Sequence, residues 1–351
     1  MFIFKVFWVI YLLTLQVFLA NSYRAKSLVP ALYVFGDSSV DAGNNNNLNT
    51  IAKVNTFPYG IDFNNCSTGR FSNGKTFADI IALKLGLPMP PAYLGVSTTE
   101  RYQIVSGINY ASGSCGILNT TRNGECLSLD KQIEYFTSTV TNDLPRNFRR
   151  KAKLSHYLSK SIFLLSIGSN DYILNYFKQE METNQKGNPE EFADYLLEQL
   201  GSKITKIYDL GGRKFVIGSI GPIGCAPSFI NRTSSSKDCN EDMNQKVKPF
   251  SNKLPWKLQE LQTQLSGSIF TISDNLKMFK KIKNSPEQFG FTNIWDSCVG
   301  QDAKPCENRK QYLFYDFGHS TEATNEICAN NCFSGRDACF PLNIEQLVRA
   351  H

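Results

Sequence analysis

Residues 28–39 read LVPALYVFGDSS, an apolar run that ends in a polar turn at Gly36, Asp37 and Ser38. Runs of this length, rich in β-branched and aromatic residues, are typical of buried strands. Four more such runs end in glycine-rich or polar turns, at residues 104–111, 161–167, 214–220 and 268–273. Longer segments with helical spacing lie between them, at residues 76–85, 129–136, 190–210 and 243–265. Strands that alternate with helices predict an α/β fold, with a parallel sheet covered on both faces.

The composition suits a large folded body. The chain has 351 residues, of which 42% are hydrophobic and 19% charged, enough for a sizeable core. No repeat, linker or charge block divides it, so we expect one domain over residues 23–351. The net charge of +6 is spread out, with residues 149–151 as the densest basic cluster. We interpret that cluster as a solvated face and expect no nucleic-acid partner.

The first 22 residues have the features of a secretory signal peptide. Residues 6–20 carry no charge, and Ala20 and Ser22 offer small side chains for cleavage. An uncleaved membrane anchor is the alternative, but no stop-transfer pattern follows. We therefore expect a secreted protein without a stable membrane span after cleavage. Sequons at Asn65, Asn119 and Asn231 predict N-glycosylation.

All ten cysteines follow the predicted signal peptide. An even count in an oxidising compartment predicts disulfide bonds. Metal binding is less favoured, because the chain has three histidines and no pair of Cys-x-x-Cys units. The sequence leaves the connectivity open; two closely spaced candidate pairs are Cys115 with Cys126 and Cys298 with Cys306.

Ser38 is a candidate nucleophile. A serine hydroxyl needs a base within hydrogen-bond reach and a carboxylate that orients the base. At the end of a strand, Ser38 is expected to begin the next helix, where the helix terminus favours negative charge. The alternative is that Ser38 only caps that helix.

Histidine is scarce, and this singles out one base. His156 lies in a polar segment and His351 is the last residue, whereas His319 lies in the motif YDFGH. Asp316 precedes His319 by three residues, close enough to fix the imidazole tautomer. A plain surface pair of Asp316 and His319 is the alternative interpretation.

Two further strand-end turns can supply donors for an oxyanion. Gly113 lacks a side chain that would block its backbone N–H, and Asn170 carries a side-chain amide. Each is also an ordinary turn former when it is considered alone. Because strand ends meet at one edge of a parallel sheet, we expect both near Ser38.

These motifs resemble those of the plant GDSL esterase/lipases of the SGNH hydrolase superfamily. The similarity runs over nearly the whole mature chain, in ALYVFGDSSVDAGNNNN (31–47), GRFSNGKTFADIIA (69–82), INYASGSCGI (108–117), IGSND (167–171), YDLGGRKFVIGSIGPIGC (208–225), NSPEQFGF (284–291) and YLFYDFGHSTEATN (312–325). The resemblance implies a flavodoxin-like three-layer α/β/α sandwich with a central parallel sheet. It also implies a Ser38, His319 and Asp316 triad, with Ser38, Gly113 and Asn170 as the oxyanion hole.

The chain departs from the family pattern at three positions. Ser114 follows Gly113 where the family usually has a second glycine, Ser320 replaces a proline after the histidine, and Ser39 replaces the leucine of the GDSL motif. Without the proline, the loop gains freedom and a backbone N–H.

The resemblance implies a serine esterase that forms an acyl-enzyme on Ser38 and needs no metal or organic cofactor. The expected substrate is a lipid, polyester, acetylated sugar or phenolic ester. An acyltransferase on the same site and a catalytically weakened binding protein are the alternatives. The expected location is the cell wall or apoplast, with the vacuole as the alternative.

Overall fold

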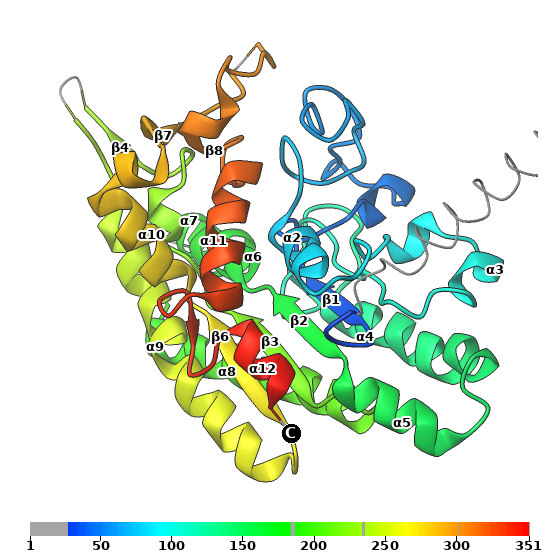
Figure 1. The fold of residues 1–351 in the computed structure, drawn as a ribbon. Coiled ribbons are helices and arrows are strands. Elements are labelled where there is room, and N and C mark those ends of the chain that lie inside the picture. The colour runs from blue at the N-terminus through cyan, green and yellow to red at the C-terminus, as the bar shows by residue number, and fades with distance from the viewer. Residues whose placement is uncertain (1–26, 184–186, 234–235, 301, 351) are drawn as a thin grey trace, which may run out of the picture.

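The computed structural model describes residues 27–183, 187–233, 236–300 and 302–350, so the predicted signal segment 1–22 lies outside the described residues. A five-stranded sheet in the order β1-β2-β3-β6-β9 forms the centre (Figure 1). Its strands are β1 (Leu32–Gly36), β2 (Ile162–Ser166), β3 (Lys214–Gly218), β6 (Ile269–Ser273) and β9 (Cys339–Phe340). The first four are parallel, and the short β9 runs antiparallel to β6.

Helices cover both faces of this sheet. One layer consists of α4 (Leu129–Ser138), α5 (Lys151–Lys160), α8 (Pro189–Asp209) and α9 (Glu241–Gln264). The other consists of α2 (Phe77–Lys84), α10 (Asn275–Asn284), α11 (Glu322–Ser334) and α12 (Ile344–Arg349). Successive strand side chains alternate between two cores: Phe163 and Leu165 face the first layer, and Ile162 and Leu164 the second. The expected three-layer α/β/α sandwich is confirmed.

The predicted helices form where capping residues and helical spacing agree. The four predicted segments become α2, α4, α8 and α9, to within two residues at each end. In α2, Thr76 and Asp79 form a reciprocal capping box that satisfies the first backbone donors.

Four of the five predicted strands are correct, and the prediction for residues 104–111 is wrong. This segment runs beside β1 and bonds to it, for example from Val34 N–H to Ile108 O at 3.1 Å. Only an isolated bridge between Val34 and Asn109 forms, however. Gly107 has a φ of +110°, which interrupts the extended backbone and brings the chain against Leu32.

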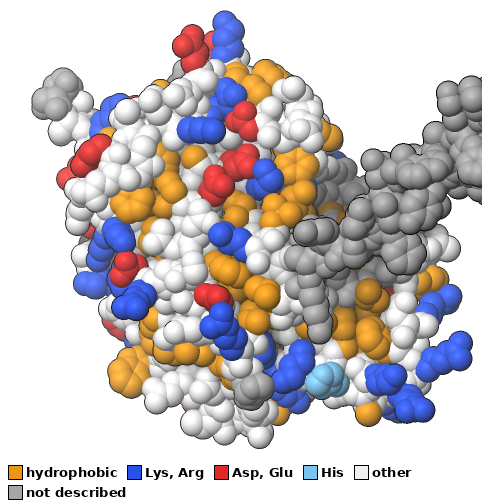
Figure 2. Space-filling view, in the orientation of Figure 1, with side chains coloured by type: hydrophobic (Ala, Val, Ile, Leu, Met, Phe, Trp, Pro, Cys, Tyr) orange, Lys and Arg blue, Asp and Glu red, His pale blue; other side chains and the backbone are white. Residues whose placement is uncertain are grey.

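The remaining short elements lie outside the central sheet. They are α3 (Thr98–Arg101), α6 (Ser169–Asp171), α7 (Phe177–Thr183), β4 (Asn231–Arg232), β5 (Lys237–Asp238), β7 (Asn293–Ser297) and β8 (Tyr312–Phe314). Across the described part of the chain, no helix combines the length and apolar character needed to cross a membrane. Basic side chains gather at the lower right of the face in Figure 2, over α5, and mix with acidic ones elsewhere.

Four disulfide bonds form, which confirms disulfide use. They join Cys115 to Cys126, Cys225 to Cys239, Cys298 to Cys306, and Cys332 to Cys339. Both of the candidate pairs, Cys115 with Cys126 and Cys298 with Cys306, are therefore correct. Cys66 and Cys328 remain free thiols. Among the described residues, the one cluster compact enough for a metal includes Cys225 and Cys239, which are bonded to each other.

Candidate active site

Ser38 lies on a turn directly after β1. The Asp37 N–H donates to Ser166 O at 3.0 Å, which ties this turn to the end of β2. Ser39 N–H donates to the Asp37 carboxylate at 2.9 Å. The expected helix at Ser38 is absent, because the next element is a single 3₁₀ turn at Asn44–Asn47. Ser38 therefore does not cap a helix.

Ser38, His319 and Asp316 form one hydrogen-bonded series. His319 Nε2 lies 2.8 Å from Ser38 Oγ, and His319 Nδ1 lies 2.8 Å from Asp316 Oδ2. Asp316 and His319 occupy the loop between β8 and α11, so the fold brings together segments separated by 281 positions. The three-residue spacing of Asp316 and His319 also allows Asp316 Oδ1 to accept the backbone N–H groups of Gly318 and His319.

The charged forms of His319 and Asp316 stabilise each other. Burial alone would lower the pKa of His319, but the negative charge and hydrogen bond of Asp316 outweigh it, so the pKa is raised above 6.5. Burial likewise opposes the Asp316 charge, yet His319 and the donors around the carboxylate hold its pKa below 3.8. The aspartate therefore stays ionised and fixes the proton on Nδ1, leaving Nε2 free to accept from serine.

Tyr59 makes a contact with Asp316 that no sequence pattern predicts. Its hydroxyl donates to Asp316 Oδ2 at 2.7 Å from a position 257 residues away. The neighbouring ring of Tyr315 packs against Tyr59 edge-on, and its own hydroxyl donates to Pro58 O at 2.6 Å. Tyr59 thus bonds to one carboxylate oxygen of Asp316, and the backbone N–H groups bond to the other.

The candidate oxyanion donors are arranged differently from expectation. A cavity of about 640 Å³ is lined by Ser38, Ser114, Asn170 and His319. Gly113 does not line it, and the Gly113 N–H donates instead to Asp41 Oδ2 at 3.1 Å. Within the described residues, no hydrogen bond engages the backbone N–H of Ser38 or Ser114. Ser114, unlike Gly113, therefore combines a place in the cavity lining with a backbone N–H that no such bond engages.

Asn170 and Ser114 are held by specific contacts. Asn170 sits on α6, and its Nδ2 donates one hydrogen bond to Cys115 O at 2.9 Å, which leaves a second amide hydrogen. Ser114 has a φ of 65°, the left-handed conformation in which a glycine is usually found. A glycine, which the family usually has at this position, adopts this backbone conformation freely, whereas Ser114 adopts it under strain.

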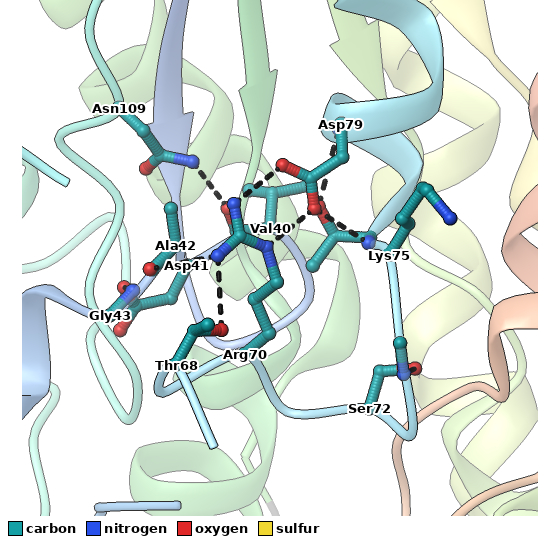
Figure 3. Close-up of polar contacts among 12 residues, drawn as sticks. Val40, Asp41, Ala42, Gly43, Thr68, Arg70, Ser72, Lys75, Asp79 and Asn109 are labelled. Carbon is teal, nitrogen blue, oxygen red and sulfur yellow. Dashed lines mark hydrogen bonds and ion pairs between the residues drawn. The ribbon is translucent and has the colours of Figure 1, made fainter. Parts of the chain in front are cut away.

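A buried ion pair fixes the loop that faces the site. Arg70 binds Asp79 in a bidentate manner, through Nε at 2.7 Å and Nη2 at 2.8 Å (Figure 3). Its Nη1 donates to Thr68 Oγ1 and to Ala42 O. One guanidinium therefore joins α2 to the two chain segments that contain Thr68 and Ala42. Phe71, the next residue, packs its ring 4.9 Å from that of His319.

We expect the rate of ester hydrolysis to depend on His319 protonation. The base is lost as the pH falls through the His319 pKa, which the structure places above 6.5. Below that pKa, kcat/KM should fall about tenfold per pH unit. A profile of kcat/KM against pH measures this, and a flat profile from pH 8 to pH 5 would contradict it.

Tyr59→Phe should shift the acid limb of the profile of kcat/KM against pH, the part where the rate falls as His319 is protonated. Without the hydroxyl, the Asp316 carboxylate is less stabilised and attracts the His319 proton more strongly, so the limb shifts to higher pH. The plateau rate should fall about tenfold, the usual size of one hydrogen bond to a charged group. Tyr315→Phe is the matched control, because it removes a hydroxyl bonded to Pro58 O rather than to the carboxylate. An equal shift in both variants would assign Tyr59 a general packing role.

A Ser–His–Asp series at the strand ends of an α/β/α sandwich is the architecture of a hydrolase. The family model described as GDSL-like Lipase/Acylhydrolase matches residues 32–331, and the chain belongs to that family. It is 39% identical to GDSL esterase/lipase At1g71691 of Arabidopsis thaliana over 94% of this chain and 88% of that protein. It is 38% identical to GDSL esterase/lipase 7 of the same plant, over 92% and 93%. The protein is a carboxylic ester hydrolase.

Proposed function

We propose that the protein cleaves carboxylic esters through an acyl-enzyme on Ser38. The observation that supports this most directly is the 2.8 Å contact between Ser38 Oγ and His319 Nε2. His319 accepts the serine proton as Oγ attacks the ester carbonyl, and Asp316 stabilises the imidazolium that forms. The proton then passes to the leaving alcohol, and water attacks the acyl-enzyme with His319 as base again.

The tetrahedral oxyanion is stabilised by three donors in this proposal. They are the backbone N–H groups of Ser38 and Ser114 and the second amide hydrogen of Asn170. Gly113 is assigned a supporting role, because its N–H bonds to Asp41 and so fixes the turn that carries Ser114. Such preformed donors act where charge develops and need no reorganisation.

Covalent labelling tests the nucleophile. A fluorophosphonate probe should label the wild-type protein, and peptide mapping should locate the adduct at Ser38. His319→Ala should label far more slowly, since the hydroxyl loses its base. The absence of any adduct would favour the catalytically weakened binding protein over the esterase.

We also propose that residues 23–351 act as one secreted, glycosylated domain. Family membership among plant esterases and four disulfide bonds support secretion. Asn65, Asn119 and Asn231 are all exposed, so each sequon is sterically open to a glycan. Digestion of the secreted protein with a peptide N-glycosidase should lower its apparent mass, and an unchanged mass would reject the glycans.

A further inference from the structure

The cavity at Ser38 extends far behind the reacting groups. Its lining includes six side chains that belong to, or pack against, the core between the sheet and the helices α10 and α11 and lie away from Ser38 in the sequence. We call the space that they border the inner chamber. They are Leu164, Val216, Met278, Ile282, Leu313 and Cys328.

The backbone elements set the depth of the inner chamber. Leu164 lies two residues before Ser166 at the end of β2, so the chamber reaches about 7 Å behind the strand end. On α11, which begins just after the His319 loop, Thr324 and Cys328 lie four residues apart on one face, a rise of about 6 Å. The lining residues thus run inward along α11. This helix covers one face of the sheet (Figure 1).

Cys328 marks the inner end of this space. The next residue on the same face of α11 is Cys332, which is fully buried and bonded to Cys339. Cys328 itself keeps some accessible surface although it lies on the buried side of the helix. That surface faces the cavity, since Cys328 is one of its lining residues.

The lining favours a hydrocarbon occupant. Burial raises the pKa of the Cys328 thiol to about 12, so it stays neutral. Two polar side chains of the lining already have partners: Thr324 Oγ1 donates to Leu313 O at 2.7 Å, and Asn275 Nδ2 donates to Ser219 O at 2.7 Å. Beside the apolar side chains of the inner chamber and the neutral thiol, a sugar hydroxyl would lose its water without gaining a partner, whereas a hydrocarbon chain gains from leaving water.

The mouth of the cavity is apolar as well. Ile51 and Phe317 line it and are 81% and 60% exposed. Side chains of this size are seldom so exposed without a binding role when they gather at one opening. An ester with an apolar chain therefore meets apolar side chains at the entrance and again in the inner chamber.

We propose that the inner chamber binds the acyl chain of the ester and that Cys328 limits the chain length. The proposal rests on the proposed function, because it takes an ester carbonyl at Ser38 as its starting point. The chain extends from the carbonyl along α11, and the alcohol leaves past Ile51 and Phe317. The substrate class is therefore esters of unbranched acyl chains of medium or greater length, rather than acetylated sugars.

The test compares p-nitrophenyl octanoate with p-nitrophenyl acetate. The wild-type protein should have a kcat/KM at least about tenfold higher for the octanoate, because each buried methylene contributes to transition-state binding. Cys328→Phe should lower the octanoate-to-acetate ratio about tenfold, and the smaller Cys328→Leu should lower it less. Glu326→Phe is the control, since it adds the same ring at an exposed position of α11 and should leave the ratio unchanged.

A binding measurement separates this proposal from the proposed function. Calorimetry with the Ser38→Ala protein reports the affinity for uncleaved p-nitrophenyl octanoate without any need for turnover. Cys328→Phe or Cys328→Leu, added to Ser38→Ala, should weaken that affinity. If the ratio and the affinity are both insensitive to Cys328, or if the wild type prefers the acetate, the chamber is not the acyl site. Loss of turnover on every ester, with octanoate affinity kept, would instead reject the catalytic mechanism and leave the chamber standing.

Discussion

Ser38→Ala should lower kcat/KM for p-nitrophenyl acetate by about 10⁴-fold while the protein stays folded. The serine hydroxyl bonds to His319 Nε2, and its loss removes the nucleophile and so the acyl-enzyme. Donors in the oxyanion hole still stabilise direct attack by water, so a small residual rate remains. Initial rates with purified protein, together with a thermal unfolding curve, measure both effects.

The adjacent Ser39 supplies a close control. Its hydroxyl lies 3.0 Å from Ser166 Oγ, and its side chain is exposed at the same turn. Ser39→Ala removes one hydroxyl from the same tetrapeptide without touching His319, and the rate should stay within about threefold of wild type. Similar losses in the two variants would mean that disturbance of the turn, rather than a missing nucleophile, explains the result.

The sequence predicts most of the sheet, because buried strands leave continuous apolar runs that need no partner to be recognised. Its failure at residues 104–111 has a local cause, since the left-handed Gly107 breaks a run that otherwise has strand composition. The helices α5, α10, α11 and α12 lie outside the predicted segments. In α5 and α10, many positions are lysine, so few apolar residues mark the buried face.

The site was predictable as a set of residue types but not as a hydrogen-bond network. The scarcity of histidine and the Asp-x-x-His spacing pointed to His319 and Asp316, and a strand end pointed to Ser38. Nothing in the sequence indicates that Asp41 binds the Gly113 N–H or that Tyr59 reaches Asp316. Such contacts join segments whose separation is fixed only by the complete fold, so they have no local signature.

Arg70→Met should destabilise the protein by about 3–5 kcal/mol. The Arg70 and Asp79 side chains are 8% and 2% exposed, so removing the guanidinium leaves a buried carboxylate without its cation. Asp79 also accepts the Thr76 N–H at the start of α2, and a displaced carboxylate would therefore loosen that helix as well. Urea unfolding followed by circular dichroism measures the loss.

Arg309 provides the comparison that isolates burial as the cause. It binds Asp62 in the same bidentate manner, through Nε at 2.6 Å and Nη2 at 2.8 Å, but the two side chains are 22% and 34% exposed. Water can solvate Asp62 once its partner is gone, so Arg309→Met should cost less than about 1 kcal/mol. If both variants lost the same stability, bidentate geometry rather than burial would determine the effect. Adding Asp79→Asn to Arg70→Met should recover part of the loss, because the amide keeps an oxygen for the Thr76 N–H and removes the unpaired charge.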